Sequence, residues 1–530
     1  MLFTSYSFIG FAALLLLVYY LIPKKLQWVL LLLASLIFYY IAGPVYLIYI
    51  LITTVTTYFC ACQIEKNADR QSEYLKVHKE ELSKEDKKLY KAHGKRIRAG
   101  WKVLGILINI GILAAAKYTN FIIANVNDIL GAFGAGEKIS LVNMILPLGI
   151  SFYTFQSLGY LIDVCRGTVH AEKNIFKYAL FISFFPQLIQ GPISRFSDLK
   201  KTLYEEHPFD GKAVSYGLQR VLWGFFKKLV IADRILAAVS TITGDIDTYH
   251  GTYAFVGMIF YTIELYADFT GGIDITIGIA QALGITVCEN FNRPYFSKSL
   301  KEYWRRWHIS MCSWFRDYIF YPVSSSKLIQ KLSKASRKHI KGSIGKHIPV
   351  HASSFVVWFT TGIWHGASWN FIVWGLLNWF VLMVSEELEP LYLKFHNRFD
   401  FGKSFAYKLF QIGRTFMLIC CLNMFDCYSS VADTIRSLCS VFTETDLSIL
   451  WNGALLELGL SMTDYCVLIF GIVILIAVSV IQRKGRVRDK IAKKPYPVRY
   501  ILWTGLFIVT LLMGAYGVGY DSSQFIYNRF

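Results

Sequence analysis

The sequence has no Cys-x-x-Cys pair, no Gly-x-Ser-x-Gly motif and no Pro/Gly/Ser-rich linker, and each absence excludes a class of protein. Its ten cysteines lie mostly inside apolar runs, so neither a disulfide framework nor a cysteine-ligated zinc site is predicted. Without a nucleophile motif, a serine or cysteine hydrolase is poorly supported. Without a linker or an internal repeat, residues 1–530 are predicted to form a single domain.

Apolar residues are what the chain has in excess. It is 54% hydrophobic over 530 residues, with a mean hydropathy of +0.41, and this favours a polytopic membrane protein. The first apolar run is followed at once by another without a cleavage site, which predicts a retained helix and not a signal peptide. The predicted fold is all-α, with about eleven transmembrane helices and shorter re-entrant or interfacial helices. The expected spans are 5–22, 26–42, 44–62, 103–125, 145–164, 214–240, 252–283, 354–385, 405–426, 463–481 and 500–519.

The formal net charge of +19 lies mainly in short loops between apolar runs, the pattern that orients membrane proteins. Residues 63–102 carry twelve Lys and Arg against seven acids and are predicted to be cytoplasmic. Two more basic stretches, 327–346 and 482–499, are also assigned to the cytoplasm. Both termini are then extracytoplasmic in a multi-pass protein of the cytoplasmic membrane. Anionic lipids are the expected partners of these basic loops, and nucleic acid is not.

Two polar stretches, 147–167 and 184–196, interrupt the apolar pattern and contain Gln156 and Gln190. Such residues either hydrogen-bond between helices or line a pore. Two prolines in the second stretch argue against one straight helix, because proline removes a backbone donor and clashes with the preceding turn. A re-entrant element buried in protein is predicted there.

Three acids, Glu264, Asp268 and Asp274, lie in the apolar run 261–278. Glu264 and Asp268 are four residues apart and share a helix face, where two carboxylates repel each other. A nearby cation must compensate them, or one must stay protonated. They are therefore either buried counter-ions for arginines elsewhere, supplied by 302–323, or part of a proton pathway or a catalytic acid.

The stretch "EYWRRWHISMCSWFRDYIFYPV", residues 302–323, has two faces if it is one helix. One face is apolar, and the other carries Arg305, His308, Cys312 and Arg316. This pattern is typical of an interfacial amphipathic helix anchored by tryptophan and arginine. Alternatively, His308 between arginine-bearing turns suits a phosphate or a developing oxyanion.

A single histidine, His365, occurs in the hydrophobic run "FTTGIWHGASWNFIVWG", residues 359–375. Such a residue is either a satisfied core histidine or a catalytic base. Gly366 beside it leaves room for a backbone or a substrate to approach, and burial favours the neutral ring that can accept a proton. A neutral histidine is the usual general base for an attacking hydroxyl.

A metal site is not predicted. His347 and His351 have His-x-x-x-His spacing, with His339 nearby, but Pro349 lies between the pair and the loop is basic.

The stretch "NFNRPYFSKSLKEYWRRWHISMCSWFRDYIFYPV" (290–323), followed by "TGIWHGASWNFIVWG" (361–375), closely resembles the membrane-bound O-acyltransferase family. Within this family, the residues of these motifs are most similar to those of the bacterial polysaccharide branch that includes alginate O-acetyltransferase. The stretches "SFYTFQSLGYLIDVCRG", "FFPQLIQGPISRF" and "YADFTGGIDITIG" resemble further signatures of this branch in the same order. The resemblance covers the layout up to about residue 425, whereas 430–530 has no recognised motif.

The resemblance implies a helix bundle around a funnel or tunnel, entered by a thioester donor from the cytoplasm and open to the acceptor on the opposite face. His365 matches the family's active-site histidine, and His308 matches the second one. The implied reaction moves an acyl group, most simply acetyl from acetyl-CoA, to hydroxyls of a cell-surface polysaccharide, directly or through a secreted SGNH-type partner. No cofactor is implied besides this donor. The residues expected to bind substrate or stabilise charge are Trp304, Arg305, Arg306, Asn292, Asp268, Gln156, Gln190 and Trp364.

Two alternatives stay open. One is transfer of D-alanine or another acyl group from an acidic carrier protein to a teichoic-acid-type polymer, with the carrier docking on the basic loops. The other is a proton-coupled transporter that uses Glu264, Asp268 and Asp274, although the paired halves common in transporters are not evident.

Overall fold

The computed structural model describes residues 3–134, 138–143, 146–340, 342–399, 402 and 404–516. This part of the chain is helical and contains no β-strand, so the all-α prediction is confirmed. Residues at the edges of two expected spans, 145–164 and 500–519, lie outside the described residues, as does the C-terminal end. The helices group into two compact units, residues 1–214 with 279–288 and residues 215–278 with 289–530. A single domain over 1–530 stays a prediction.

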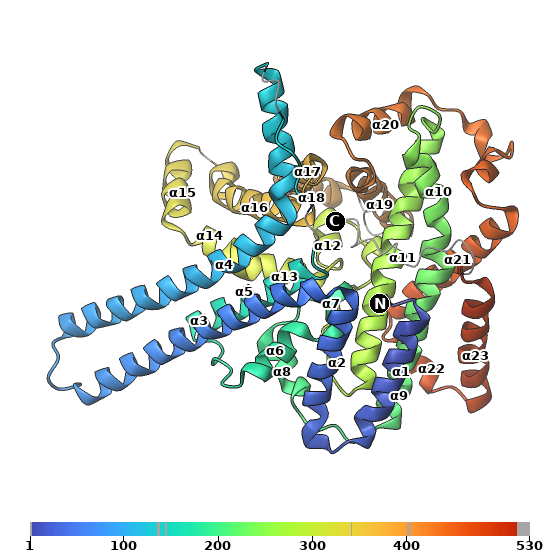
Figure 1. Ribbon diagram of the computed structural model, residues 1–530. Coiled ribbons are helices and arrows are strands. Elements are labelled where there is room, and N and C mark those ends of the chain that lie inside the picture. Colours follow the sequence, from blue (N-terminus) through green and yellow to red (C-terminus); the bar gives the residue numbers. More distant parts are fainter. Residues whose placement is uncertain are drawn as a thin grey trace. The chain divides into compact units, whose positions relative to one another are not determined.

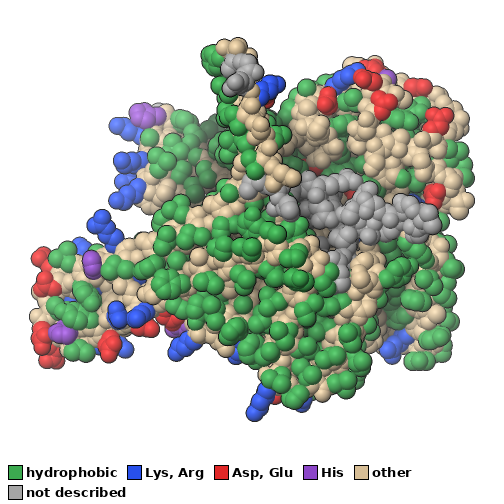
Figure 2. Space-filling model, viewed as in Figure 1, with side chains coloured by type: hydrophobic (Ala, Val, Ile, Leu, Met, Phe, Trp, Pro, Cys, Tyr) green, Lys and Arg blue, Asp and Glu red, His purple; other side chains and the backbone are tan. Residues whose placement is uncertain are grey.

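A long antiparallel helix pair, α3 and α4, dominates the first unit (Figure 1). With 34 residues, α3 is about 51 Å long, which exceeds the ~30 Å apolar thickness of a bilayer. The basic segment 63–102 therefore prolongs this pair as helix, and Figure 2 shows charged side chains gathered at its end. The elements of this unit are α1 (Tyr6–Leu21), η1 (Lys24–Leu26), α2 (Gln27–Ala42), α3 (Pro44–Val77), α4 (Lys84–Ala132), α5 (Ile150–Arg166), α6 (Ile175–Ser183), α7 (Phe185–Gln190) and α8 (Phe196–Leu203).

The second unit contains His308, His365 and the C-terminal helices. Helix α9 (Gly211–Phe225) enters it, and it holds most of α11 (Thr252–Ala282). Its other elements are η2 (Phe226–Ala232), α10 (Asp233–Gly244), η3 (Pro294–Phe296), α12 (Leu300–Trp304), α13 (Ile309–Phe315), η4 (Arg316–Phe320), α14 (Tyr321–Ser324), α15 (Lys327–His339), α16 (Ser343–His365), α17 (Trp369–Glu387), α18 (Glu389–Arg398), α19 (Phe405–Cys427), α20 (Val431–Thr443), η6 (Leu447–Leu450), η7 (Ala454–Leu458), α21 (Met462–Gln482), α22 (Val487–Ala492) and α23 (Tyr496–Met513).

Seven helices within the described residues are long and apolar enough to cross a membrane. They confirm the class of a multi-pass membrane protein, while the count of about eleven spans stays a prediction. These helices are Lys24–Ala42, Pro44–Val77, Lys84–Ala132, Trp369–Glu387, Phe405–Cys427, Met462–Gln482 and Tyr496–Met513.

The expected single span 354–385 is wrong. The chain breaks directly after His365, where α16 ends, and α17 begins at Trp369. Gly366 adopts an extended conformation, and the hydroxyl of Ser368 accepts a hydrogen bond from the backbone N–H of Asn370, capping α17. The break leaves His365 at a helix terminus, where its ring is not enclosed by a continuing turn.

Glycines seven residues apart on two helices let α9 and α11 approach closely. A Cβ on Gly224 would lie 2.6 Å from the carbonyl oxygen of Gly271, and one on Gly278 would lie 2.7 Å from that of Gly217. Small residues at such positions permit backbone contact between membrane helices. This contact brings the cations of α9 and η2 next to the acids of α11.

Candidate active site

His308 lies at a break in the chain and not within a helix. Helix α12 ends at Trp304 and α13 begins at Ile309, so the expected continuous helix over 302–323 is wrong. His308 has φ 43° and ψ 53°, and Arg293 is the only other non-glycine residue with positive φ in the described part of the chain. A buried non-glycine residue in this left-handed region is costly and occurs mainly at functional sites.

Asn290 fixes the ring of His308. Its side-chain oxygen accepts hydrogen bonds from the backbone N–H and the hydroxyl of Ser310, each 2.9 Å long. Nδ1 of His308 lies 3.2 Å from the amide nitrogen and 3.3 Å from the amide oxygen of Asn290. The side chain of Asn290 therefore holds the His308 ring through Nδ1 and leaves Nε2 outside this contact.

The structure brings His308 and His365 into one aromatic cluster. Trp364 packs between them, with ring centroids 6.3 Å from His308 and 5.0 Å from His365. Trp374 packs on the other side of His365 at 4.6 Å. Burial and, next, the neighbouring His365 lower the pKa of His308 well below its ordinary value. His308 is consequently neutral at physiological pH, in a site that is crowded by aromatic rings.

Gly366 is required for the packing at His365. A Cβ at this position would lie 2.2 Å from the ring of Phe371, whose plane stacks on His365 with centroids 6.2 Å apart. Its extended backbone suits any residue, so the constraint is steric and not conformational. Only glycine lets Phe371 and His365 keep this arrangement.

Gly366→Ala is expected to lose about 1–3 kcal/mol of stability and to depress acyl transfer, because the added methyl displaces Phe371 and with it the imidazole. The double variant Gly366→Ala with Phe371→Leu should recover part of both losses. Thermal unfolding and product formation measure the two effects. Full activity in the single variant would contradict this account.

The neighbouring aromatic and basic residues have different positions. The indole N–H of Trp304 donates to the side-chain oxygen of Asn378 at 3.1 Å. Arg306 forms an ion pair with Glu302 at 2.5 Å. The Arg305 side chain is exposed and has no ion-pair partner among the described residues. Of the two arginines, only Arg305 is thus available to meet an anion.

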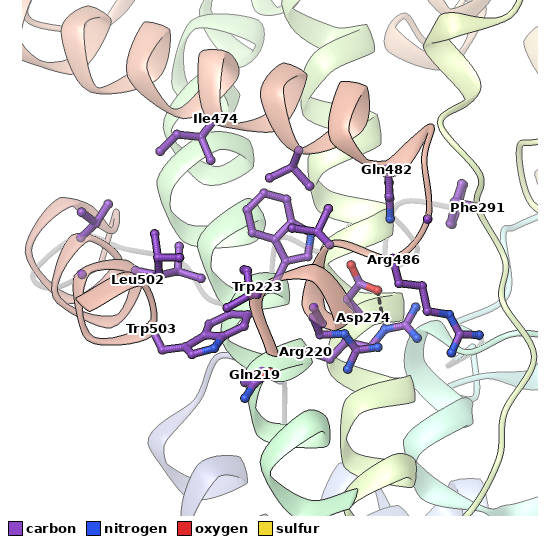
Figure 3. A pocket seen from close by; sticks show the side chains of 18 of the residues that line it. Gln219, Arg220, Trp223, Asp274, Phe291, Ile474, Gln482, Arg486, Leu502 and Trp503 are labelled. Atoms are coloured by element: carbon purple, nitrogen blue, oxygen red, sulfur yellow. Dashed lines mark hydrogen bonds and ion pairs between the residues drawn. The ribbon is translucent and has the colours of Figure 1, made fainter. Parts of the chain in front are cut away.

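A cavity of about 740 Å³ lies between α9, α21 and α23. In Figure 3 the apolar Ile474, Leu502 and Trp503 lie toward the left of the cavity, and the arginines Arg220 and Arg486 lie toward its right. Exposed Asn292 and partly buried Ile309, the residue after His308, also line it. An amphiphilic ligand with an anionic group fits such a lining.

A smaller cavity of about 60 Å³ shares Arg220, Trp223 and Phe291 with the large one and reaches Asn290. Because Asn290 hydrogen-bonds to His308, the two cavities lead from the basic end of α21 toward the histidine site.

Arg486 and Arg488 give the large cavity an excess of positive charge, whereas its third arginine, Arg220, is neutralised by acids. Arg220 is occupied by Asp274 and Glu289, with contacts of 2.7 and 2.5 Å. Arg486 has no acidic partner within ion-pair distance among the described residues, and burial followed by repulsion from Arg220 lowers the pKa of Arg488. An anion would relieve this repulsion, so the cavity mouth is suited to phosphate.

Asp268 is a buried counter-ion. Its carboxylate forms an ion pair with Lys228, which also contacts Asp233 at 2.8 Å. Asp274 is paired with Lys227 at 2.6 Å. The cations come from η2 and α9, not from the arginines of 302–323, so the expected source was wrong. This geometry favours the counter-ion alternative over a proton pathway.

Gln156 and Gln190 belong to the first unit. Gln156 donates a long 3.4 Å hydrogen bond to Gln187, whose amide also donates to Ser194 at 2.5 Å. Gln190 is completely buried at the end of the six-residue helix α7. The chain leaves α7 in an extended conformation at Gly191, so the exclusion of one straight helix is confirmed, while a re-entrant position in the membrane stays a prediction.

Sequence reasoning missed Asn290, Ser310, Phe371 and Trp374. A signal existed for the last two, because they follow His365 on the next helix, within the same quoted motif. Asn290 and His308 are 18 residues apart, and this spacing does not predict a hydrogen bond between them.

Comparison with known proteins finds that residues 169–336 match the model of the membrane-bound O-acyltransferase family. His308 is inside the matched range and His365 is outside it. A probable alginate O-acetylase from Pseudomonas aeruginosa is 36% identical over 307 residues, which cover 56% of this chain and 54% of that protein. These matches confirm the resemblance predicted from the motifs.

Two further relatives are more distant. A peptidoglycan O-acetyltransferase from Helicobacter pylori is 29% identical over 322 residues, covering 56% of this chain and 57% of that protein. A teichoic acid D-alanyltransferase from Bacillus subtilis is 29% identical over 249 residues, covering 44% and 58%. The chain spans about half the length of the curated relatives it matches.

Proposed function

We propose that this chain, whose residues 169–336 match the membrane-bound O-acyltransferase family model, is an O-acyltransferase that moves acetyl from a cytoplasmic thioester to an extracytoplasmic polysaccharide. The acceptor hydroxyl is reached directly or through a secreted SGNH-type partner. The single observation that carries the proposal is the aromatic cluster in which Trp364 joins the buried His308 to the partly buried His365. Similarity to O-acetylating relatives supports acetyl as the transferred group.

His365 is the general base in this proposal. It takes the proton of the acceptor hydroxyl as the hydroxyl oxygen attacks the thioester carbonyl carbon. The carbon–sulfur bond then breaks, the ester remains on the acceptor, and the leaving thiolate receives the proton from His365. Protons and electron pairs balance, so the reaction needs no cofactor besides the donor.

His308 stabilises the oxyanion that forms on the carbonyl oxygen. In the tautomer that the proposal requires, Asn290 donates to Nδ1 and the ring hydrogen is on Nε2, where it serves as the donor to this oxyanion. The left-handed backbone and the buried packing hold this donor without reorganisation. Arg305 is exposed near this turn and would orient an anionic part of the donor.

The donor occupies the cavity between α9, α21 and α23. Phosphate groups of acetyl-CoA would meet Arg486 and Arg488, while the narrower pantetheine arm passes Asn290 toward His308. The basic stretch 482–499, predicted to be cytoplasmic, contains both arginines, so the cavity would open to the compartment that holds acetyl-CoA. In this topology the chain lies in the cytoplasmic membrane with both termini outside.

Purified protein given labelled acetyl-CoA and an acceptor glycan tests the proposal. Acetyl transfer is expected, and Arg486→Gln or Arg488→Gln should raise KM for acetyl-CoA about tenfold with little change in kcat, since each loses a charge-assisted contact to phosphate. Arg483→Gln is the matched control, because Arg483 is close in sequence but does not line the cavity. Equal KM values in the Arg486 and Arg483 variants would remove the donor assignment.

A second candidate donor is a D-alanyl carrier protein, favoured by the similarity to a teichoic acid D-alanyltransferase. A carrier would dock through acidic side chains on the basic surface and insert its phosphopantetheine arm. In the same assay, transfer from the charged carrier with none from acetyl-CoA would select this alternative.

A further inference from the structure

Two histidines on α16 contact the same carboxylate oxygen of a glutamate on α17. Nδ1 of His347 lies 2.8 Å from Oε1 of Glu387, and Nε2 of His351 lies 2.7 Å from the same oxygen. All three potential ligand atoms lie within 4.8 Å of one another. His351 is nine-tenths buried, whereas His347 and Glu387 are partly exposed, so the cluster is accessible from one side.

The sequence argues against this cluster because Pro349 separates the histidines, yet α16 continues through the proline. Pro349 has no N–H for the carbonyl oxygen of Gly345, four residues earlier. The hydroxyl of Ser336 on α15 donates to that oxygen instead, at 2.8 Å. Gly345 permits this contact, since a Cβ there would lie 2.2 Å from the carbonyl oxygen of Ile340. The unbroken helix then sets His347 and His351 four residues apart on one face.

We propose that His347, His351 and Glu387 bind one Zn²⁺ ion. Two imidazole nitrogens and one carboxylate oxygen are a common zinc ligand set, and histidines at i and i+4 of a helix suit a single ion. Zinc–ligand distances of about 2.0–2.1 Å place tetrahedral ligands about 3.3 Å apart. Each histidine nitrogen must therefore move roughly half an ångström away from Glu387, and the two nitrogens, which lie within 4.8 Å of each other, must settle at the same spacing. A cavity of about 460 Å³ beside His351 and Glu387 has room for a water as the fourth ligand.

The ion would join two helices that carry the proposed catalytic site. His351 precedes His365 by fourteen residues on α16, about 21 Å along the helix axis. Glu387 is the last residue of α17, which begins beside His365 in sequence. At that distance the ion takes no part in acyl transfer, and its effect is to hold the remote ends of α16 and α17 together. This inference does not depend on the proposed function.

Zinc titration of the full-length chain tests the site. The protein is purified in detergent, its cysteines are alkylated, bound metal is removed with a chelator, and ZnCl₂ is added in competition with a chromophoric zinc indicator. One equivalent is expected to bind, and zinc should raise the thermal unfolding midpoint. His347→Ala, His351→Ala and Glu387→Gln should each weaken binding at least tenfold.

His170→Ala is the matched control, because His170 pairs with Glu65 at 2.7 Å and belongs to no group of three potential metal ligands among the described residues. It should leave the zinc affinity unchanged. If an alanine variant fails to fold, His351→Gln keeps the side-chain size, and circular dichroism verifies its helices.

Acidity separates a metal site from a shared ion pair. Protons compete with zinc for imidazole nitrogens, so added acid should release the bound zinc. An ion pair without metal would show no zinc-dependent stabilisation at any pH. Absence of zinc binding at micromolar concentrations, or equal binding in His351→Ala, would overturn the proposal.

Discussion

Replacing His365 by alanine is expected to lower acyl transfer by about 10²–10⁴-fold, the usual contribution of a general base. Without the imidazole, the acceptor hydroxyl must attack while it retains its proton. The loss should appear mainly in kcat, because His365 acts on the hydroxyl in the transition state and not on the donor phosphates. Rates with purified protein, together with the acetyl content of the surface glycan in cells, measure the effect.

His396→Ala is the control for this variant. His396 is on α18, its ring nitrogen lies 2.5 Å from the backbone carbonyl oxygen of Tyr392, and its ring packs against Phe395 and Tyr407. It should retain full activity. Unfolding of the His365→Ala protein must be excluded, because Trp364 and Trp374 pack on the missing ring. A folded His365→Ala protein with normal acylation would disprove the assignment.

The sequence predicts the helical class well because apolar runs report directly on burial in a bilayer. It fails where a local conformation depends on distant partners. The break at His308 is one example, since the left-handed backbone is supported by the backbone N–H of Ile309 donating to the carbonyl oxygen of Asn290 at 2.9 Å. The helical periodicity of residues 302–323 does not predict that hydrogen bond.

Pro349 is the opposite case, because a residue that usually ends a helix does not end this one. The lost hydrogen bond is replaced by Ser336, whose position depends on how α15 packs against α16. Sequence rules correctly count the backbone hydrogen bond that proline removes. They do not include the Ser336 hydroxyl, which comes from another helix and replaces that bond. The proline between His347 and His351 therefore does not by itself separate the two side chains, because α16 continues through it.

For the buried acids, the sequence predicts that a cation is needed but not which residue supplies it. Their need for a cation follows from the cost of an unpaired carboxylate at bilayer depth. The partner could not be identified from sequence, because the glycine contact between α9 and α11 decides which lysine reaches Asp268. Lys227 and Lys228 lie in the apolar run 214–240, where they resemble isolated interruptions.

Lys228→Met is expected to destabilise the protein by about 3–5 kcal/mol, the typical cost of removing one partner from a buried ion pair. The substitution keeps an unbranched side chain of similar size and removes its charge. Asp268 and Asp233 then remain buried beside each other without their shared cation. The thermal unfolding midpoint in detergent should fall, and less folded protein should be recovered from membranes.

The triple variant Lys228→Met, Asp233→Asn, Asp268→Asn should recover most of this stability, because it removes the charges together. Lys331→Met on the exposed face of α15 is the control for loss of one positive charge, and it should have almost no effect. If Lys228→Met were as stable as the wild type, the pair would not hold α11 against η2. If the triple variant stayed as unstable as Lys228→Met, lost packing and not unpaired charge would be the cause.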